Sequence, residues 1–411
     1  MWLKRILIGV GTPVGVTRDN WRLLEAIGRP WWFYRSGGRV PPGRIERRSP
    51  TPVTEADVAL CERLLAAFTA ITSQGAEQGE THHGIWAWIL KAHQQRLADM
   101  LEHGDARELA LLLAAMFQKE FVWGIAHGGH LRESESWLGS KILSLKSLDL
   151  LVSLAEALGV VPVENPEQGL AGVAFDGGIV KLIAKVDEAL GFRVDAPHVG
   201  APFGLAVDGH LITLETPEQI YATVRLDQAI RVHLHQRPES RLKIVDIGGG
   251  YGAMCYWLLH MQPDIARYTI VDLPITNVLQ GYFLAQALGP ATVSFYGEPY
   301  ARVTLLPTSA LTEVETPFDV LVNKNGMPEM PHHAMVGYLE WARVSCDGFF
   351  YSYNQEAGAD FQGQTQHLVP EAVERIGGFN RIRRDQSWLR RGYAEEIYTR
   401  KEQLPAPLTA A

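Results

Sequence analysis

A glycine-rich turn that follows an apolar run is the feature that most constrains the fold of this chain. Residues 242–247 form the apolar run, which leads into the segment Asp246-Ile-Gly-Gly-Gly-Tyr-Gly252. Further along, Tyr268-Thr-Ile-Val-Asp272 is a second apolar run that ends in a carboxylate. Strand, tight turn, helix, strand and acid together make one βαβ unit of a nucleotide-type fold. The sequence therefore predicts a parallel sheet with a ligand site at the carboxyl ends of its strands.

Two classes of cofactor compete for this turn. Gly248, Gly250 and Ala253 match the dinucleotide pattern G-x-G-x-x-G/A, in which Asp272 would hold a ribose diol. However, Asp246 stands just before the turn, where a pyrophosphate requires a helix N-terminus without opposing negative charge. S-adenosylmethionine (SAM) carries a sulfonium and an ammonium in place of phosphates, and an acid attracts both. We interpret the turn as a SAM site.

The same residues carry a family resemblance. The spacing D-x-G-x-G-x-G, followed by Asp272, resembles motifs I and II of class I SAM-dependent methyltransferases (EC 2.1.1). The resemblance places Asp272 on the ribose, and it places Ser309 where related enzymes contact the adenine. The full set of residues that it implies for cofactor binding is Asp246, Gly248, Gly250, Gly252, Asp272, Leu273, Ser309 and Asn323.

Length and charge limit the class of protein. A chain of 411 residues is too long for one core and indicates two domains. Lys and Arg number 38 against 46 Asp and Glu, a net charge of -8, which argues against a nucleic-acid partner and is compatible with a cationic substrate. No apolar run has the length of a membrane span, and three widely separated cysteines indicate reduced thiols. We therefore expect a cytoplasmic protein.

The sequence predicts two domains and a short tail. Residues 1–237 are expected to form a mainly helical domain that binds or covers the acceptor, the molecule that receives the methyl group. Residues 238–403 are expected to form the SAM-binding domain, and residues 404–411 a disordered tail. A hairpin is expected to turn on Asp208-Gly209. Apolar spacing and capping residues predict helices at residues 54–72, 85–103, 106–126, 148–158 and 216–235.

From residue 242 onward, strands and helices are predicted to alternate. The expected fold is α/β, with a Rossmann-like sheet of seven strands preceded by the helical domain. A late hairpin would place one antiparallel strand among parallel ones, a feature of the class I methyltransferase sheet that dehydrogenase domains lack. The seven strands are expected at residues 242–247, 268–272, 291–296, 318–323, 347–354, 379–386 and 393–399.

A second segment, Phe318-Asp-Val-Leu-Val-Asn-Lys-Asn-Gly-Met-Pro-Glu-Met330, adds a closer resemblance. An apolar strand that ends in Asn and continues as x-Asn-x-Met-x-Glu-Met resembles the sugar O-methyltransferase family. Ser352-Tyr-Asn354 also resembles that family, as does the upstream segment that starts with Leu154-Ala-Glu-Ala-Leu-Gly159. The chain is further similar to the aminoglycoside N-methyltransferases, including those of the gentamicin pathway. It has Gly326 where the family often has a serine.

This resemblance implies an acceptor site at the ends of the fourth and fifth strands. Glu329 and His332 are the candidate catalytic bases, because an acceptor loses a proton as it is methylated. The family pattern supports Glu329, for which the alternative role is a cap of the following helix. A histidine titrates near neutral pH, and the alternative for His332 is simple solvent exposure. Asn325, Asn354 and His333 are expected to bind the substrate.

No metal is expected. His127-Gly-Gly-His130, with Glu133 and Glu135 close by, has residue types that ligate metals. Two glycines between the histidines favour a loop, however, and no helical metal motif accompanies them.

The sequence therefore predicts a SAM-dependent methyltransferase that acts on a nitrogen atom of an amino sugar, in an aminoglycoside antibiotic intermediate. Methylation of a sugar hydroxyl is the alternative, and an NAD-dependent oxidoreductase is a more distant one. The expected partner is a small sugar or aminoglycoside, with no nucleic acid and no membrane. A homodimer is left open.

Overall fold

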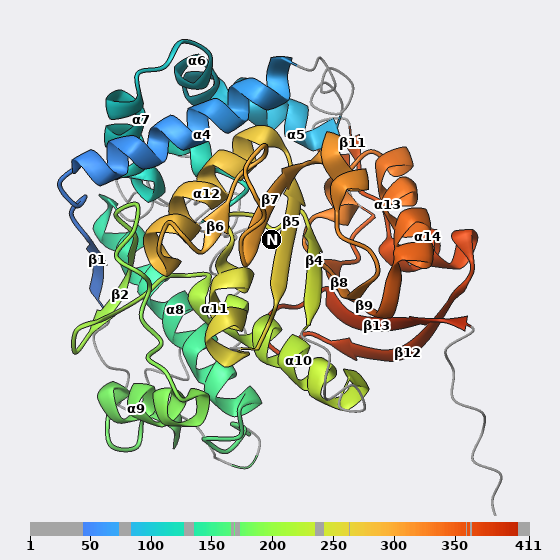
Figure 1. Ribbon diagram of the computed structural model, residues 1–411. Coiled ribbons are helices and arrows are strands. Elements are labelled where there is room, and N and C mark those ends of the chain that lie inside the picture. Colours follow the sequence, from blue (N-terminus) through green and yellow to red (C-terminus); the bar gives the residue numbers. More distant parts are fainter. Residues whose placement is uncertain are drawn as a thin grey trace, which may run out of the picture. The chain divides into compact units, whose positions relative to one another are not determined.

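The chain divides into two compact units, which we describe separately. The first unit contains residues 1–52 and 114–221, and the second contains residues 53–113 and 222–411. This division differs from the expected boundary at residue 238, since residues 53–113 belong to the same unit as the large sheet. The computed structural model describes residues 44–73, 84–126, 135–165, 168, 173–234, 242–262, 264–358, 360–361 and 364–401 (Figure 1).

The first unit holds a small antiparallel sheet and two long helices. Asp208 and Gly209 join two of its strands with φ angles of 47° and 76°, which confirms the predicted hairpin. The strands pair in the order β1 (Arg44–Arg47), β2 (Phe203–Val207) and β3 (His210–Ile212). The helical segments are η2 (Met116–Gln118), η3 (Glu120–Val122), α8 (Trp137–Ala157), η7 (Val173–Phe175) and α9 (Ile179–Leu190), and α10 (Thr216–Leu234) continues into the second unit.

Two sequence-based predictions bear on this part of the chain. The helix predicted over residues 106–126 is wrong beyond Leu113, because the chain leaves the second unit there and Ala115 takes a non-helical φ of −121°. Of the segment considered for a metal, only Glu135 is described, and its carboxylate lies 3.5 Å from the guanidinium of Arg47. The histidines of that segment, and the tail predicted at residues 404–411, lie outside the described residues.

The second unit is built on an eight-stranded sheet with the order β12-β13-β9-β8-β4-β5-β7-β6. β13 is antiparallel to both of its neighbours, and the remaining pairs are parallel. This arrangement confirms the predicted α/β fold with a late antiparallel hairpin. The strands are β4 (Lys243–Ile247), β5 (Arg267–Asp272), β6 (Val293–Ser294), β7 (Val303–Pro307), β8 (Phe318–Lys324), β9 (Cys346–Gln355), β12 (Phe379–Gln386) and β13 (Tyr393–Arg400). A separate two-stranded ribbon pairs β10 (Asp360–Phe361) with β11 (Gln364–Thr365).

The predicted third strand is misplaced. Residues 291–296 contribute only β6, a two-residue strand at the sheet edge. The strand beside β5 is β7, which is buried along its whole length. Of β6 and β7, only β7 pairs with a strand on each side, so it takes the place that the sequence analysis gave to the earlier segment.

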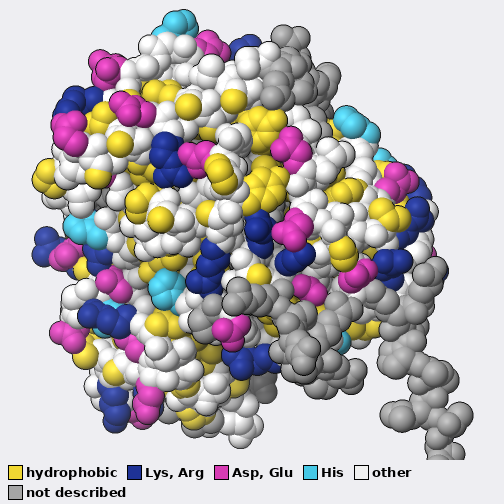
Figure 2. Space-filling model, in the orientation of Figure 1, with side chains coloured by type: hydrophobic (Ala, Val, Ile, Leu, Met, Phe, Trp, Pro, Cys, Tyr) yellow, Lys and Arg dark blue, Asp and Glu magenta, His cyan; other side chains and the backbone are white. Residues whose placement is uncertain are grey.

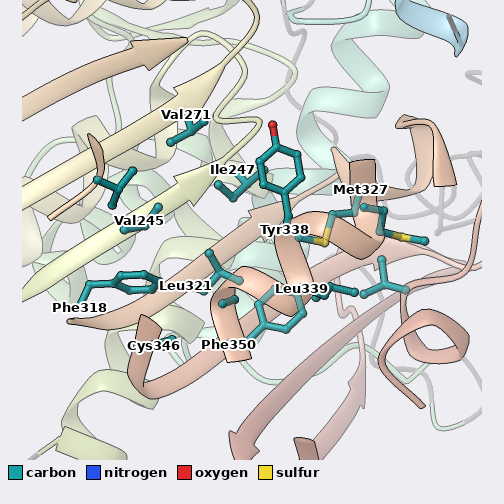
Figure 3. Packing of buried hydrophobic residues seen from close by; sticks show 14 of the residues in the cluster. Val245, Ile247, Val271, Phe318, Leu321, Met327, Tyr338, Leu339, Cys346 and Phe350 are labelled. Carbon is teal, nitrogen blue, oxygen red and sulfur yellow. The ribbon is translucent and has the colours of Figure 1, made fainter. Parts of the chain in front are cut away.

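Helices cover both faces of this sheet. On one face, α13 (His332–Ser345) and α14 (Val369–Ile376) enclose the main apolar cluster, in which Leu339 lies beside Leu321 and Phe350 (Figure 3). α12 (Pro274–Leu288) covers the opposite face, where Leu305 contacts its Gly281. The next residue, Leu306, belongs to the cluster under α13, as the alternation of side chains along a strand requires.

The first helix of the second unit packs on α12. Thr54 and Asp57 cap α4 (Glu55–Ser73) through reciprocal hydrogen bonds. Arg63 of α4 makes a bidentate ion pair with Glu298, with N–O distances of 2.8 and 2.7 Å. The other helical segments here are α5 (Gly84–Ile89), η1 (Leu90–Gln94), α6 (Gln95–His103), α7 (Ala106–Leu113), α11 (Ala253–Met261), η8 (Thr308–Glu313) and η9 (Met327–Glu329).

Acidic and basic side chains are interspersed on the visible face of the molecule, without a single-sign field (Figure 2). None of the helices within the described residues combines the length and the apolar character that crossing a bilayer requires. The three cysteines, Cys61, Cys255 and Cys346, are buried free thiols, as the sequence predicts.

Candidate cofactor and acceptor site

The glycine-rich turn joins β4 to α11 at the centre of the parallel strands. Gly248, Gly250 and Gly252 all have positive φ angles, of 76°, 61° and 92°. The amide of Gly248 donates to the carbonyl of Val271, 2.9 Å away, and so ties the turn to β5. At Gly252 a Cβ atom would lie 2.8 Å from the Leu284 side chain, so both backbone angle and space require glycine. The strand order changes direction here, which is where open α/β sheets bind ligands.

Asp246 lies beneath this turn and is only 2% exposed. Its Oδ2 accepts a hydrogen bond of 2.8 Å from the hydroxyl of Tyr268, and its Oδ1 has no partner among the described residues. Burial raises the pKa of Asp246 to about 7, against the lowering effects of Tyr268 and Lys324. One buried carboxylate oxygen therefore has no protein partner among the described residues, and contact of Asp246 with a cofactor remains a prediction.

Asp272 ends β5 and is oriented by two donors of the protein. Its Oδ1 accepts from the backbone amide of Leu273 at 2.8 Å, and its Oδ2 accepts from Nε2 of Gln280 at 2.7 Å. Burial, with a smaller contribution from the charge of Asp246, raises its pKa to about 7, although these hydrogen bonds and one with Gly250 lower it. A carboxylate offers about four lone-pair sites, so acceptor capacity remains for a ligand beside these donors.

Gln280 was not singled out from the sequence. It is fully buried in α12, and its Nε2 also donates to the carbonyl of Gly250 at 2.8 Å. The sequence feature that could have identified it is a glutamine inside the apolar run Val278-Leu-Gln-Gly-Tyr-Phe-Leu284. A polar side chain that is buried there needs hydrogen-bond partners. Its partners come from the turn and from the end of β5, which the sequence alone does not bring together.

Two further cofactor candidates are nearby in the fold. Leu273 is the N-cap residue of α12 and directly follows Asp272. Ser309 lies in η8, immediately after β7, and is exposed. Both positions follow strands that neighbour β4 or β5 in the sheet. Their contact with a cofactor remains a prediction.

Asn323 has a structural set of partners. It is fully buried near the end of β8, and its Nδ2 donates to the carbonyl of Ile247 at 2.7 Å. Its Oδ1 accepts from the amide of Met327 at 3.1 Å. The side chain thus fastens the end of β4, where the turn begins, to the segment that carries Glu329. This arrangement makes Asn323 a positioning residue, and direct contact with a cofactor stays a prediction.

Asn325 and Asn354 lie at adjacent strand ends. The amide of Asn325 donates to the carbonyl of Tyr353 at 3.0 Å, in a left-handed conformation with φ of 63°. Nδ2 of Asn354 donates to the hydroxyl of Ser352 at 2.9 Å. The Oδ1 atom of each asparagine is buried without a partner among the described residues. Two acceptor oxygens are therefore available for a ligand that carries N–H or O–H donors.

Glu329 is the most strongly perturbed candidate on the acceptor side. Burial raises its pKa to about 7, while the charge of Arg390 and a hydrogen bond with Trp86 lower it. The alternative role as a helix cap finds no support, because α13 begins after Pro331 without a side-chain cap. A carboxyl group with this pKa can accept a proton near neutral pH.

The two histidines are placed differently. Nε2 of His332 lies 3.3 Å from the guanidinium of Arg375, and its ring meets the ring of His367 edge to face at 5.1 Å. His333 is exposed. His332 therefore contacts Arg375 of α14 and His367, which precedes that helix. This placement favours Glu329 over His332 as the base.

Comparisons with known proteins add little beyond the fold. No family model matches the sequence, and no curated protein matches it. Solved structures that match in part include the mitomycin 7-O-methyltransferase MmcR, with 13% identity over 83% of this chain and 94% of that one and a TM-score of 0.36. An O-methyltransferase family protein from Burkholderia thailandensis has 13% identity over 62% and 70%, with a TM-score of 0.35. Magnesium protoporphyrin IX methyltransferase from Synechocystis PCC 6803, with bound SAM, has 12% identity over 44% and 81%, with a TM-score of 0.30. Similarities this low carry no inference about the activity of this chain.

Proposed function

We propose that this chain is a SAM-dependent methyltransferase that methylates a nitrogen atom of an amino sugar, in an aminoglycoside intermediate. The observation that carries the first part is the glycine turn at the switch point of the sheet, with one buried acid beneath it and a second, pre-oriented acid at the end of β5. Two carboxyl groups make this site favourable for a cation and unfavourable for a pyrophosphate.

The residues present fit SAM. Asp272 would hold the ribose diol through the remaining acceptor capacity of its carboxylate, and the glycine turn would allow close approach of the ligand. Leu273 and Ser309 would line the adenine. The unpaired Oδ1 of Asp246 is a buried acid whose ionised form a cationic ligand stabilises. When bound, SAM supplies a methyl group on a sulfonium, with a neutral thioether as the leaving group.

The protein contributes alignment and proton transfer on the acceptor side. The Oδ1 atoms of Asn325 and Asn354 would accept hydrogen bonds from the substrate and so orient the atom that attacks the methyl group. Glu329 would then take the proton that this atom loses. With a pKa of about 7, Glu329 is a weak base, and a weak base suffices for an ammonium group. The net charge of -8 also supports a cationic acceptor.

One observation favours a second candidate, the methylation of a sugar hydroxyl. The positive charge of Arg390 acts on Glu329, and it would oppose an ammonium group brought to the same place. A neutral hydroxyl meets no such opposition. The two candidates differ in their dependence on pH, which the Glu329 variant described in the Discussion tests.

The cofactor class is tested by calorimetry on the full chain with SAM and, separately, with NAD. We expect saturable binding of SAM and none of NAD. Binding of NAD in preference to SAM would overturn the proposal and return the chain to the dinucleotide class.

Replacement of Asp272 by alanine should weaken SAM binding by about 1.5–3 kcal/mol, the magnitude of hydrogen bonds to a charged group. The exposed residue Asp264, which precedes β5, provides the control, since Asp264→Ala removes an equal charge away from the strand end. Equal affinities in the parent and in Asp272→Ala, measured by calorimetry, would disprove the ribose assignment.

A further inference from the structure

We infer that Gln280 is a cofactor-positioning residue, which presets the Asp272 carboxylate and the glycine turn in one geometry before the ligand arrives. The inference rests on the proposed function, because it assigns Gln280 a role toward the same cofactor. It names a residue of α12 that no motif identifies.

The geometry of the Gln280 amide carries this inference. Its two N–H groups are both used, one on the carbonyl of Gly250 at 2.8 Å and one on Oδ2 of Asp272 at 2.7 Å. Its Oε1 accepts from Nδ2 of Asn277 at 2.9 Å. The carbonyl of Gly250 can only accept, and this fixes the orientation of the amide, with its oxygen toward the donor Asn277.

Because Gln280 is buried, its hydrogen bonds restrict the positions of their partners. Gln280 has no exposed surface, and its donor Asn277 is 7% exposed. A buried amide that lost either partner would leave a polar group unsatisfied, so the two partners are held at a fixed separation. Gln280, which we call the clamp because it holds both groups, therefore links two parts of the proposed site, Gly250 and Asp272, that are 22 residues apart in the sequence.

The charge of Asp272 is the property that this clamp controls. The groups that act on the carboxyl are the Leu273 amide, Gln280, the Gly250 backbone and the titratable Asp246. Gln280 stabilises the ionised form, so its loss should move the pKa of Asp272 upward from about 7. A diol is bound best by the ionised carboxylate, and the affinity for the cofactor should therefore rise with pH through this range.

The test measures the affinity of the full chain for S-adenosylhomocysteine by calorimetry across neutral pH. Gln280→Met keeps the length of the side chain and removes both donors, and Gln280→Glu keeps the shape and adds a negative charge. At pH 7 we expect binding weaker on the order of tenfold, the factor that one pKa unit carries, with the pH midpoint moved upward. Gln286→Met, at an exposed position on the same helix, is the matched control and should bind like the parent.

A double-mutant cycle separates positioning from a general loss of structure. Because part of the effect of Gln280 depends on the charge of Asp272, Gln280→Met should weaken binding less in an Asp272→Asn background than in the parent. An unchanged affinity and pH profile in Gln280→Met would overturn the inference, as would an equal loss in both backgrounds. A parent protein that fails to bind S-adenosylhomocysteine would instead refute the proposed function, and with it this inference.

Discussion

Glu329→Gln should reduce turnover at neutral pH by about 10²–10⁴-fold, the contribution of a positioned general base. Glutamine keeps the size of the side chain and cannot take the proton. SAM binding should change far less than turnover, because Glu329 is not among the candidate cofactor contacts. In the parent, turnover should rise as pH increases through about 7, where Glu329 ionises.

The pH dependence of this variant distinguishes the two acceptor atoms. An ammonium group loses its proton to water as the solution becomes alkaline, so the Glu329→Gln variant should recover if nitrogen is methylated. A hydroxyl group titrates too high for such recovery. A severe defect that does not change with pH would therefore favour oxygen, and a variant as active as the parent would remove Glu329 from the mechanism.

Stability measurements guard against a trivial explanation of this defect. The folded pKa of Glu329 lies above its ordinary value of 4.5, so the parent loses stability as pH rises from the unfolded value toward about 7. Glutamine does not ionise and has no such cost. Above about pH 7, the free energy of unfolding of Glu329→Gln should therefore be at least as large as that of the parent. Glu340→Gln, at an exposed position on α13, should match the parent in both activity and stability.

Gly250→Val should abolish measurable SAM binding. Gly250 has a φ of 61°, a region that a β-branched residue enters only with strain of about 1–3 kcal/mol. The valine side chain would also occupy space at the turn that the ligand needs. A shift of the backbone that relieved the strain would move the carbonyl of residue 250, to which Gln280 donates. Calorimetry with SAM measures this loss directly.

Gly289→Val is the matched control for this variant. Gly289 ends α12 with a φ of 94°, and a Cβ there would meet only Thr292, at 3.9 Å. The control therefore also places valine at a positive φ, but away from the turn, and it should lose stability while keeping its affinity for SAM. If Gly250→Val bound SAM like the parent, the turn would not be the cofactor site.

The sequence predicted those parts of the fold that depend on local pattern. Alternating apolar runs and the glycine turn were enough for the βαβ unit and for the late hairpin of β12 and β13. The strand β7 was missed because five residues that end in Pro307 give a weak signal, although burial on both faces makes them a central strand. The packing of α4 on α12 could not be predicted, because it depends on contacts such as the hydrogen bond between Gln286 and Asp57, 229 residues apart.

The candidate site was predictable only where the backbone alone positions a residue. Asp272 and the glycines follow from strand ends and turn geometry. The burial of Asp246 depends on Tyr268 from another strand, and Gln280 depends on a partner 30 residues away in Gly250. Side-chain hydrogen bonds of this kind have no spacing rule in the sequence, because tertiary packing sets them.

Methyl transfer by the full chain is the measurement that tests the central claim most directly. The protein is incubated with methyl-labelled SAM and a panel of aminoglycoside intermediates, with neutral sugars alongside, and mass spectrometry locates the label. We expect the label on an amino nitrogen of an aminoglycoside intermediate. Label on a hydroxyl group would contradict the assignment of the acceptor atom, and binding of SAM without transfer to any member of the panel would contradict the account as a whole.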